Sequence, residues 1–286
     1  MQSRAELGQP DGVDGMTRAV RIHYRYAYSE PVTGLHHRLL VVPPDIHGRQ
    51  VLLSYGLEVR GASSRPRVVE EWDAFGNRVY RIEADRIPHA VDFEARFRVA
   101  TMRSEPPASS VDWQPFRSPT ALTAPDRRLR RVARALRAAS PRRDASALAE
   151  AAHQWAGQAI VSRAGVTDYR TPAALALHLG SGVCQDFAHI LLVLLRLLEI
   201  PARYVSGHLP GEGPPHAWVE ALVGNQVAGF DPSHRRPTDD RYITVAVGRD
   251  YADVTPTSGV FSGAARGALS YTKRTEAIPS VGGVAA

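Results

Sequence analysis

Residues 180–199 read Gly180-Ser-Gly-Val-Cys-Gln-Asp-Phe-Ala-His-Ile-Leu-Leu-Val-Leu-Leu-Arg-Leu-Leu-Glu199. From residue 183 onward the segment is apolar nearly all round, which is the pattern of a helix that is buried on every side or lies in a membrane. We expect the buried case, because the run is shorter than the ~20 residues that span a bilayer and contains Arg196 before Pro201. Other elements of the chain must therefore surround this helix.

The segments on either side of the helix predict two domains. Residues 16–103 contain short alternating runs separated by turn residues, which favours an N-terminal antiparallel β-sandwich-like domain. Residues 104–124 are rich in Pro and Ser and are expected to form a linker. Residues 125–275 show helical periodicity first and strand-like runs afterwards, so we expect an α+β domain there. Residues 1–15 and 276–286 are expected to be a disordered lead and a disordered tail.

The composition is that of a folded protein. Of 286 residues, 44% are hydrophobic and 22% are charged, close to ordinary globular values. The formal net charge is +6, carried almost wholly by arginine, and Lys273 is the only lysine. A solvated helix face explains the arginines of residues 127–143, and no aromatic platform accompanies them, so we do not expect a nucleic acid partner. The composition does not fix the oligomeric state.

The single cysteine, Cys184, excludes an intrachain disulfide. A lone thiol suits a reducing compartment, and the polar opening of the chain lacks the apolar core of a signal peptide, so we expect a cytoplasmic protein without membrane association. We expect no cofactor and no metal, because His189, His208 and His216 do not have the usual ligand spacing and a metal on the thiol would block it.

The position of Cys184 indicates chemistry. It lies directly before the buried helix, where free backbone N–H groups and the helix dipole stabilise a thiolate. Gly180 and Gly182 allow a sharp turn and are expected to leave room for a substrate. Taken alone, a cysteine at such a place is ordinarily a small buried hydrophobic residue. A functional interpretation therefore needs a base beside it.

His216 and Asp231 are the candidates for the missing groups. His216 begins one strand-like run, Asp231 ends the next, and the two runs are joined tightly at Gly224-Asn225. An antiparallel hairpin over these residues brings the two side chains together. A carboxylate bonded to one ring nitrogen fixes the imidazole tautomer and leaves the other nitrogen facing a thiol. That is the arrangement of a nucleophile, a base and an orienting acid.

Several separated stretches carry a resemblance to a known family. They are Gly182-Val-Cys-Gln-Asp-Phe-Ala-His189, Ile200-Pro-Ala-Arg-Tyr-Val-Ser-Gly207, His216-Ala-Trp218 and Phe230-Asp-Pro232, with Gly165-Val-Thr-Asp-Tyr-Arg-Thr171 upstream and Gly248-Arg-Asp-Tyr-Ala-Asp-Val254 downstream. Together they resemble the bacterial transglutaminase-like proteins, and the β region with Asp73, Phe75, Gly76 and Asn77 resembles that family's N-terminal domain. The resemblance spans about residues 16–262.

The resemblance implies a papain-like catalytic domain over residues 125–275, with Cys184 as nucleophile, His216 as base and Asp231 as orienting acid. It implies acyl transfer on amide bonds of a peptide or protein through a thioester on Cys184, with water or an amine as acceptor. The sequence departs from the family pattern at Glu199, where a glycine is common, and at Ser233-His234, where Thr-Asn is usual. Neither departure is expected to touch the triad.

Three further residues are expected to bind substrate. Gln185 and Gly182 flank the nucleophile, and Trp218 shares the strand face of His216, where it either walls a substrate channel or belongs to the core. The alternative to an enzyme is a non-catalytic binding or scaffold protein that retains the transglutaminase-like fold.

Overall fold

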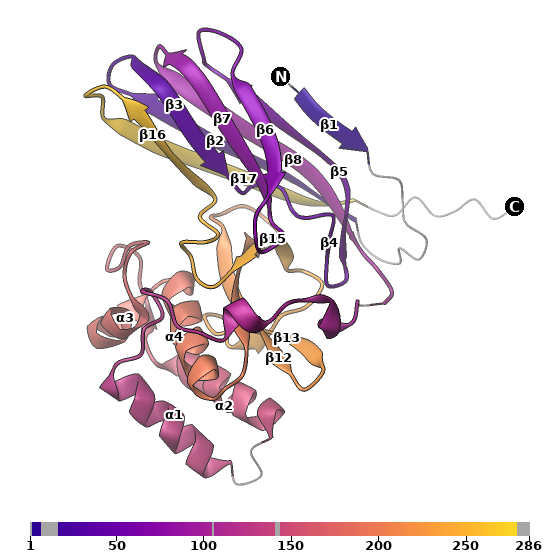
Figure 1. The fold of residues 1–286 in the computed structure, drawn as a ribbon, viewed down its shortest axis with the longest axis vertical. Coiled ribbons are helices and arrows are strands. Elements are labelled where there is room, and N and C mark those ends of the chain that lie inside the picture. Colours follow the sequence, from indigo (N-terminus) through magenta and orange to yellow (C-terminus); the bar gives the residue numbers. More distant parts are fainter. Residues whose placement is uncertain (1, 7–16, 105, 141–143, 279–286) are drawn as a thin grey trace, which may run out of the picture.

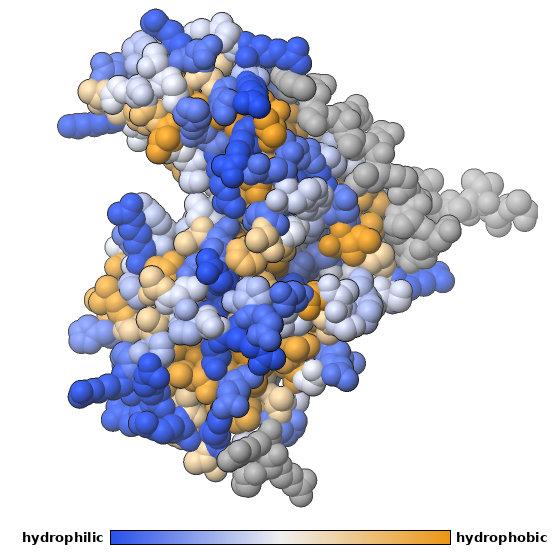
Figure 2. Space-filling model, in the orientation of Figure 1, coloured by the Kyte–Doolittle hydropathy of each residue, from blue (hydrophilic) through white to orange (hydrophobic). Residues whose placement is uncertain are grey.

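Two lobes make up the chain, a β sandwich and a mixed lobe of helices and strands (Figure 1). The computed structural model describes residues 2–6, 17–104, 106–140 and 144–278. Figure 2 shows the surface hollowed at one side, where the sandwich meets the mixed lobe. The α+β class expected from the sequence is confirmed.

Two sheets form the sandwich and enclose an apolar core. One sheet has the order β1-β5-β8-β2-β17, with β4 paired to β5, and the other has the order β16-β3-β7-β6. The alternation of burial along the strands places Ile22, Ile82 and Phe93 in the core between the sheets. The bounds are β1 Gln2–Glu6, β2 Thr17–Tyr28, β3 Val32–Leu39, β4 Ile46–His47, β5 Gln50–Arg60, β6 Arg67–Trp72, β7 Arg78–Ile87, β8 Ala90–Thr101, β16 Thr257–Ser262 and β17 Gly267–Ile278.

Helix α4 (Cys184–Leu197) is the centre of the mixed lobe and is buried along almost its whole length. The helices α1, α2 and α3 pack against it, as do β11 and β12 of a sheet with the order β14-β13-β12-β11-β15. None of the helices in the described part of the chain is long and apolar enough to cross a bilayer. The bounds are α1 Arg127–Ala139, α2 Ala145–Gln158, α3 Ala173–Leu179, β11 Ala202–His208, β12 His216–Val223, β13 Gln226–Asp231, β14 Arg236–Pro237 and β15 Ile243–Gly248.

The two ends of the chain differ from the expected domain boundaries. Where a disordered lead was expected, residues 2–6 form β1 and pair with β5, while residues 7–15 lie outside the described residues. β16 and β17 were expected to belong to the catalytic domain, but β16 pairs with β3 and β17 pairs with β2 along 12 residues. Both strands cover sheet edges that would otherwise leave backbone groups unpaired. β17 continues to residue 278, inside the expected tail, and residues 279–286 lie outside the described residues.

Within the segment expected to be a linker, residues 104–124, the described residues 106–124 pack onto the mixed lobe. Trp113 and Phe116 are buried. Arg196 of α4 donates hydrogen bonds to the carbonyl of Phe116 at 3.1 Å and to Oγ1 of Thr123 at 2.8 Å. Burial lowers the pKa of Arg196 to about 10, so the guanidinium stays charged at neutral pH and holds this segment over α4.

Side chains of the sandwich fix the mixed lobe through the backbone of β15. Asn77 donates from Nδ2 to the carbonyl of Val247 at 2.7 Å and accepts from its N–H at 2.8 Å. Gln50 makes the same pair of hydrogen bonds with Thr244, at 2.8 and 2.9 Å. An amide that bonds both backbone groups of one residue orients the strand as well as holding it.

β17 makes a further connection between the lobes. Lys273, the only lysine, is buried, and its Nζ donates to the carbonyl of Leu209 at 2.8 Å. Leu209 follows β11 directly, and the next strand of the chain, β12, begins with His216. The last strand of the sandwich therefore holds the connection that leads to His216.

The C-terminus of α4 contains a left-handed residue that is not glycine. Glu199 has a φ of 68°. The N–H of Ile200 donates to the carbonyl of Leu195, and the N–H of Glu199 donates to that of Arg196, which is the hydrogen-bond pattern of a Schellman motif. Glycine adopts this conformation without steric cost, so the departure from the family at Glu199 introduces backbone strain.

Replacing Glu199 by glycine is expected to raise the free energy of unfolding by about 1 kcal/mol, because it removes this strain. Urea unfolding followed by tryptophan fluorescence measures the change. The matched control is Glu199→Ala, which also loses the 3.1 Å ion pair with Arg137 but retains a Cβ. If the glycine variant is no more stable than the alanine variant, the backbone at residue 199 is not strained.

Candidate active site

Cys184 is the first residue of α4 and is partly buried. The carboxylate of Asp186 folds back over the start of the helix, where its Oδ2 accepts hydrogen bonds from the N–H of Val183 and from Oγ1 of Thr167, both at 2.7 Å. Burial raises the pKa of Asp186. Asp186 caps the helix. Among the described residues, the N–H of Cys184 has no hydrogen-bond acceptor, as expected in the first turn of a helix.

Gly182 leaves the space that this cap occupies. From the sequence, that space was expected to be open to a substrate. A Cβ at this position would lie 2.5 Å from Oδ2 of Asp186 and 2.8 Å from its Cβ. The space beside Gly182 is therefore filled by the capping carboxylate instead of being left for a substrate. Upstream of Cys184, β10 (Ser181–Gly182) pairs in parallel with β9 (Val161–Ser162), which fixes the approach to the helix.

The hairpin expected from the sequence is confirmed. β12 begins with His216, β13 ends with Asp231, and the two strands pair antiparallel up to the turn, where Val223 lies opposite Gln226. Nε2 of His216 lies 2.7 Å from Oδ2 of Asp231. The hairpin therefore brings together the imidazole and the carboxylate that the sequence had placed at its two ends.

Asp231 is fully buried, and hydrogen bonds reach both of its carboxylate oxygens. Besides His216, Oδ2 accepts from Nδ1 of His234 at 2.6 Å and from the hydroxyl of Tyr242 at 2.8 Å. Oδ1 accepts from Oγ of Ser233 at 2.8 Å and from the N–H of His234 at 3.1 Å. Burial opposes the charged form, but the hydrogen bonds and the charge of His216 outweigh it and hold the pKa of Asp231 well below its usual range.

Sequence reasoning missed Ser233, His234 and Tyr242 as neighbours of the site. The expectation that the departure at Ser233-His234 lies clear of the triad is wrong, because both side chains bond Asp231. A local signal existed, since an aspartate in a turn commonly bonds the backbone of residues just after it, which keeps their side chains near. Tyr242 has no such signal, because folding of the sheet brings it to the carboxylate.

The second ring nitrogen of His216, Nδ1, is the one left for Cys184. Burial alone would lower the pKa of His216, but hydrogen bonds to Asp231 and to the Cys184 side chain outweigh burial and raise it to about 9. The imidazole therefore holds a proton at neutral pH. An imidazolium in this place is suited to pairing with a thiolate and to donating a proton.

Of the other predicted site residues, Gln185 and Trp218 are both buried. Nε2 of Gln185 donates to the carbonyl of Asp168 at 3.3 Å. The ring of Trp218 lies nearly parallel to that of His216, with centroids 6.2 Å apart, and meets Tyr242 edge-on at 5.2 Å. Trp218 thus packs against two residues that contact Asp231. The substrate-binding role expected of Gln185 and Trp218 stays a prediction.

The described residues contain a group of possible metal ligands. This group consists of His216, Asp231 and His234. One ligand atom from each lies within 4.8 Å of the other two, so the three side chains could hold a metal ion. Hydrogen bonds already join the three side chains. His189 has a structural role instead: its Nε2 accepts from the N–H of Tyr251 at 3.2 Å, and burial lowers its pKa to about 3.

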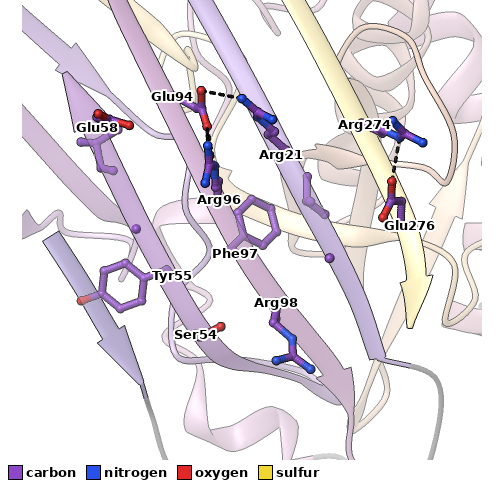
Figure 3. Close-up of a pocket in the computed structure, with 14 residues that line it drawn as sticks. Arg21, Ser54, Tyr55, Glu58, Glu94, Arg96, Phe97, Arg98, Arg274 and Glu276 are labelled. Carbon is purple, nitrogen blue, oxygen red and sulfur yellow. Dashed lines mark hydrogen bonds and ion pairs between the residues drawn. The ribbon is translucent and has the colours of Figure 1, made fainter. Parts of the chain in front are cut away.

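A surface pocket of about 540 Å³ lies away from these residues, on the sheet that contains β2, β5, β8 and β17 (Figure 3). Its charged side chains pair with one another: Arg21 and Arg96 with Glu94, and Arg274 with Glu276. No residue that lines the pocket belongs to α4, β12 or β13. The pocket is therefore separate from the candidate active site.

Comparison with known proteins shows the family to which the chain belongs. Residues 130–242 match the family described as "Transglutaminase-like superfamily", and residues 19–100 match "Bacterial transglutaminase-like N-terminal region". An uncharacterized protein of Mycobacterium leprae is 32% identical over 261 residues, which cover 83% of this chain and 90% of the relative. The chain belongs to the transglutaminase-like superfamily.

Two further proteins are similar to this transglutaminase-like chain, one in part of its sequence and one in its fold. An uncharacterized protein of Mycobacterium tuberculosis is 38% identical over 114 residues, 34% of this chain and 36% of that protein. The crystal structure of "a Putative Cysteine Protease from Cytophaga hutchinsonii" matches with a TM-score of 0.75 and 21% identity, over 98% of this chain and 94% of that chain. This likeness confirms the two-lobed fold that the resemblance implied.

Replacing Gly182 by alanine is expected to lower the free energy of unfolding by about 2 kcal/mol and to slow alkylation of Cys184, because the new Cβ displaces the capping carboxylate of Asp186. Urea unfolding and iodoacetamide labelling measure the two effects. Gly180→Ala is the control: an added Cβ there meets nothing within 4 Å, so it costs only the strain of a φ of 69°. Equal effects of the two variants would argue against the clash.

The raised pKa of His216 also makes stability depend on pH. Because the folded state favours the protonated ring, this contribution is complete below pH 6.5 and is lost as the pH rises through about 9. Relative to His216→Asn, the wild type is expected to lose about 3 kcal/mol of unfolding free energy over that range. Urea titrations at about pH 6 and about pH 10 test this, and an equal change in both proteins would speak against it.

Proposed function

We propose that this chain is a cysteine-dependent enzyme that cleaves or exchanges amide bonds of peptide or protein substrates. The proposal is carried by the 2.7 Å hydrogen bond between Nε2 of His216 and the buried carboxylate of Asp231, together with the raised pKa of His216, to which the side chain of Cys184 contributes. Membership of the transglutaminase-like superfamily supports it, since the resemblance implies the same three residues in the same roles.

In the first half of the proposed reaction, the thiolate of Cys184 attacks the carbonyl carbon of an amide and forms a C–S bond. The resulting oxyanion lies at the first turn of α4, where the free N–H of Cys184 donates to it. The C–N bond then breaks, and Nδ1 of His216 gives its proton to the departing nitrogen. The products of this half are a thioester on Cys184 and a free amine.

In the second half, water or an amine attacks the thioester. His216, now neutral, takes a proton from the attacking group, the C–S bond breaks, and the thiolate returns beside a protonated imidazole. Asp231 remains ionised throughout, in keeping with its low pKa, and holds the ring in the orientation that faces the thiol. With water the reaction is hydrolysis, and with an amine it forms a new amide.

The nature of the substrate and the location of the protein belong to the same proposal. The family resemblance implies a peptide or protein substrate, and we propose the hollow between the lobes (Figure 2) as the place where it binds. A thiol nucleophile remains reduced in the cytoplasm, which is why we place the protein there. Cell fractionation with an antibody tests the location.

We expect an electrophilic peptide library to label Cys184 in the folded protein, as mass mapping of the labelled peptide will show. Peptide hydrolysis or incorporation of a fluorescent amine is expected to fall by about 10² to 10⁴-fold in His216→Asn, because the general base is lost. His89→Asn is the matched control, since His89 is exposed in the turn between β7 and β8.

Two outcomes would count against the proposal. If no peptide set is turned over and Cys184 does not react while the protein is folded, a non-catalytic scaffold with this fold becomes the better interpretation. If turnover survives in both Cys184→Ala and His216→Asn, the chemistry resides elsewhere.

A further inference from the structure

A cavity of about 340 Å³ lies where three parts of the chain meet. Its wall consists of residues 44–48 and 74–77 of the sandwich, residues 106–116, and side chains of β11 and β15. No residue of α4, β12 or β13 lines it, so it is separate from the candidate active site. Small-molecule sites occupy roughly 300 to 1,000 Å³ and favour junctions between domains, and this cavity has both properties.

The guanidinium of Arg203, on β11, lies in this wall and is almost completely shielded from solvent. Its side chain is 8% exposed. Nε and Nη2 both contact Oε2 of Glu220, at 2.8 and 2.6 Å, and the guanidinium carbon lies 5.0 Å from the ring centre of Trp113. Nη1 has no hydrogen-bond acceptor among the described residues. Because a guanidinium offers five N–H donors, Nη1 is the part of this cation that remains for a ligand.

Glu220 does not face the cavity, although it pairs with Arg203. Its carboxylate is shared with His47, whose Nε2 lies 2.9 Å from Oε1 and 3.1 Å from Oε2. Burial opposes the charged form of Glu220, but His47 and Arg203 outweigh burial and hold its pKa well below the usual range. Arg203 and His47 line the cavity, whereas Glu220 does not. The basic partners of this buried cluster are therefore the ones that a ligand meets.

The acidic residue in the wall is less able to oppose an anion. Asp112 is exposed, and its Oδ1 accepts a hydrogen bond from the N–H of Gln114 at 3.0 Å. Solvent screens an exposed charge, whereas the charge of the shielded Arg203 acts in a place with little water. The electrostatic preference of the cavity is thus for a negative group.

Much of the remaining wall is apolar. The rings of Phe75 and Phe116 line it with centroids 5.7 Å apart, and Phe116 meets Trp113 edge-on at 5.9 Å. Val111 and Val247 line it as well. A few polar groups among apolar walls fix the orientation of a small ligand, while the rings supply contact area. The lining therefore suits a molecule that has an acid group on a small apolar body.

We propose that this cavity binds a small organic carboxylate, which accepts a hydrogen bond from Nη1 of Arg203 and packs its apolar part against Phe75 and Phe116. The site does not depend on the proposed function, since none of the candidate catalytic residues takes part. A charge-assisted hydrogen bond between a guanidinium and a carboxylate is among the strong ones, and shielding from water strengthens it further.

A bound carboxylate contacts both lobes at once. Phe75 belongs to the sandwich and Arg203 to the mixed lobe, where β11 pairs with β12, the strand that begins with His216. The unfolded chain does not hold these segments together, so the ligand binds the folded state and stabilises it.

Phenylacetate is the probe, because it joins one carboxylate to one ring. Isothermal titration calorimetry is expected to show one phenylacetate bound per chain, and saturating phenylacetate is expected to raise the midpoint of thermal unfolding. Phenylacetamide has the same shape without the charge. We expect it to bind at least about tenfold more weakly, because the hydrogen bond to Arg203 loses its charged acceptor.

Two variants test the location. Ala74 is exposed and lines the cavity, so Ala74→Trp is expected to fill its mouth and abolish binding without disturbing the ion pair. Ala264→Trp is the matched control, because Ala264 is also exposed but does not line the cavity. The double variant Arg203→Met, Glu220→Gln removes both charges, so that neither is left buried alone. It is expected to bind phenylacetate no better than phenylacetamide.

Three outcomes would overturn the proposal. They are the absence of saturable phenylacetate binding to the wild type, equal affinities of the wild type for phenylacetate and phenylacetamide, and equal binding by Ala74→Trp and Ala264→Trp. The comparison of the two tryptophan variants remains decisive if the double variant does not fold. None of these readouts needs turnover, so they decide the role of the cavity whether or not Cys184 is catalytic.

Discussion

The enclosure of α4 is the constraint on which the rest of the structure depends. Residues 185–196 are all buried, so the helix has no face that can meet water. Burying apolar surface contributes about 25 cal/mol per Å² to stability. Every side of α4 gains this stabilisation only because helices, the sheet and residues 106–124 together cover it. Cys184, the residue directly before this buried run, is partly accessible. Cys184 consequently stands at the open end of an element that the whole lobe immobilises.

Local patterns explain why much of this architecture could be predicted. The apolar run before Pro201 predicts the buried helix, and the tight turn at Gly224-Asn225 predicts the hairpin that joins His216 to Asp231. The membership of β17 could not be predicted in this way. Lys273 is the one buried residue of that strand, so the strand has no apolar face from which its sheet could be predicted. Its position is determined by backbone pairing with β2, which is far away in the sequence.

In the candidate site too, some features could be predicted from local sequence and others could not. The three predicted catalytic residues lie on separated motifs whose order is visible in the sequence, whereas the surroundings of Asp231 depend on tertiary folding, as Tyr242 illustrates. Gly182 marks a different limit. A glycine two residues before Cys184 suggests room for a ligand. That room is taken by the side chain of Asp186, four residues along the chain, and sequence does not show which way a side chain folds.

Lys273 has a consequence beyond joining the lobes. It is the only side-chain amine of the chain, and it is buried with its Nζ held by the carbonyl of Leu209. A thioester on one copy would therefore find no accessible lysine on another copy. If amide exchange between proteins is the reaction, copies of the enzyme cannot accept an acyl group from one another on a lysine side chain.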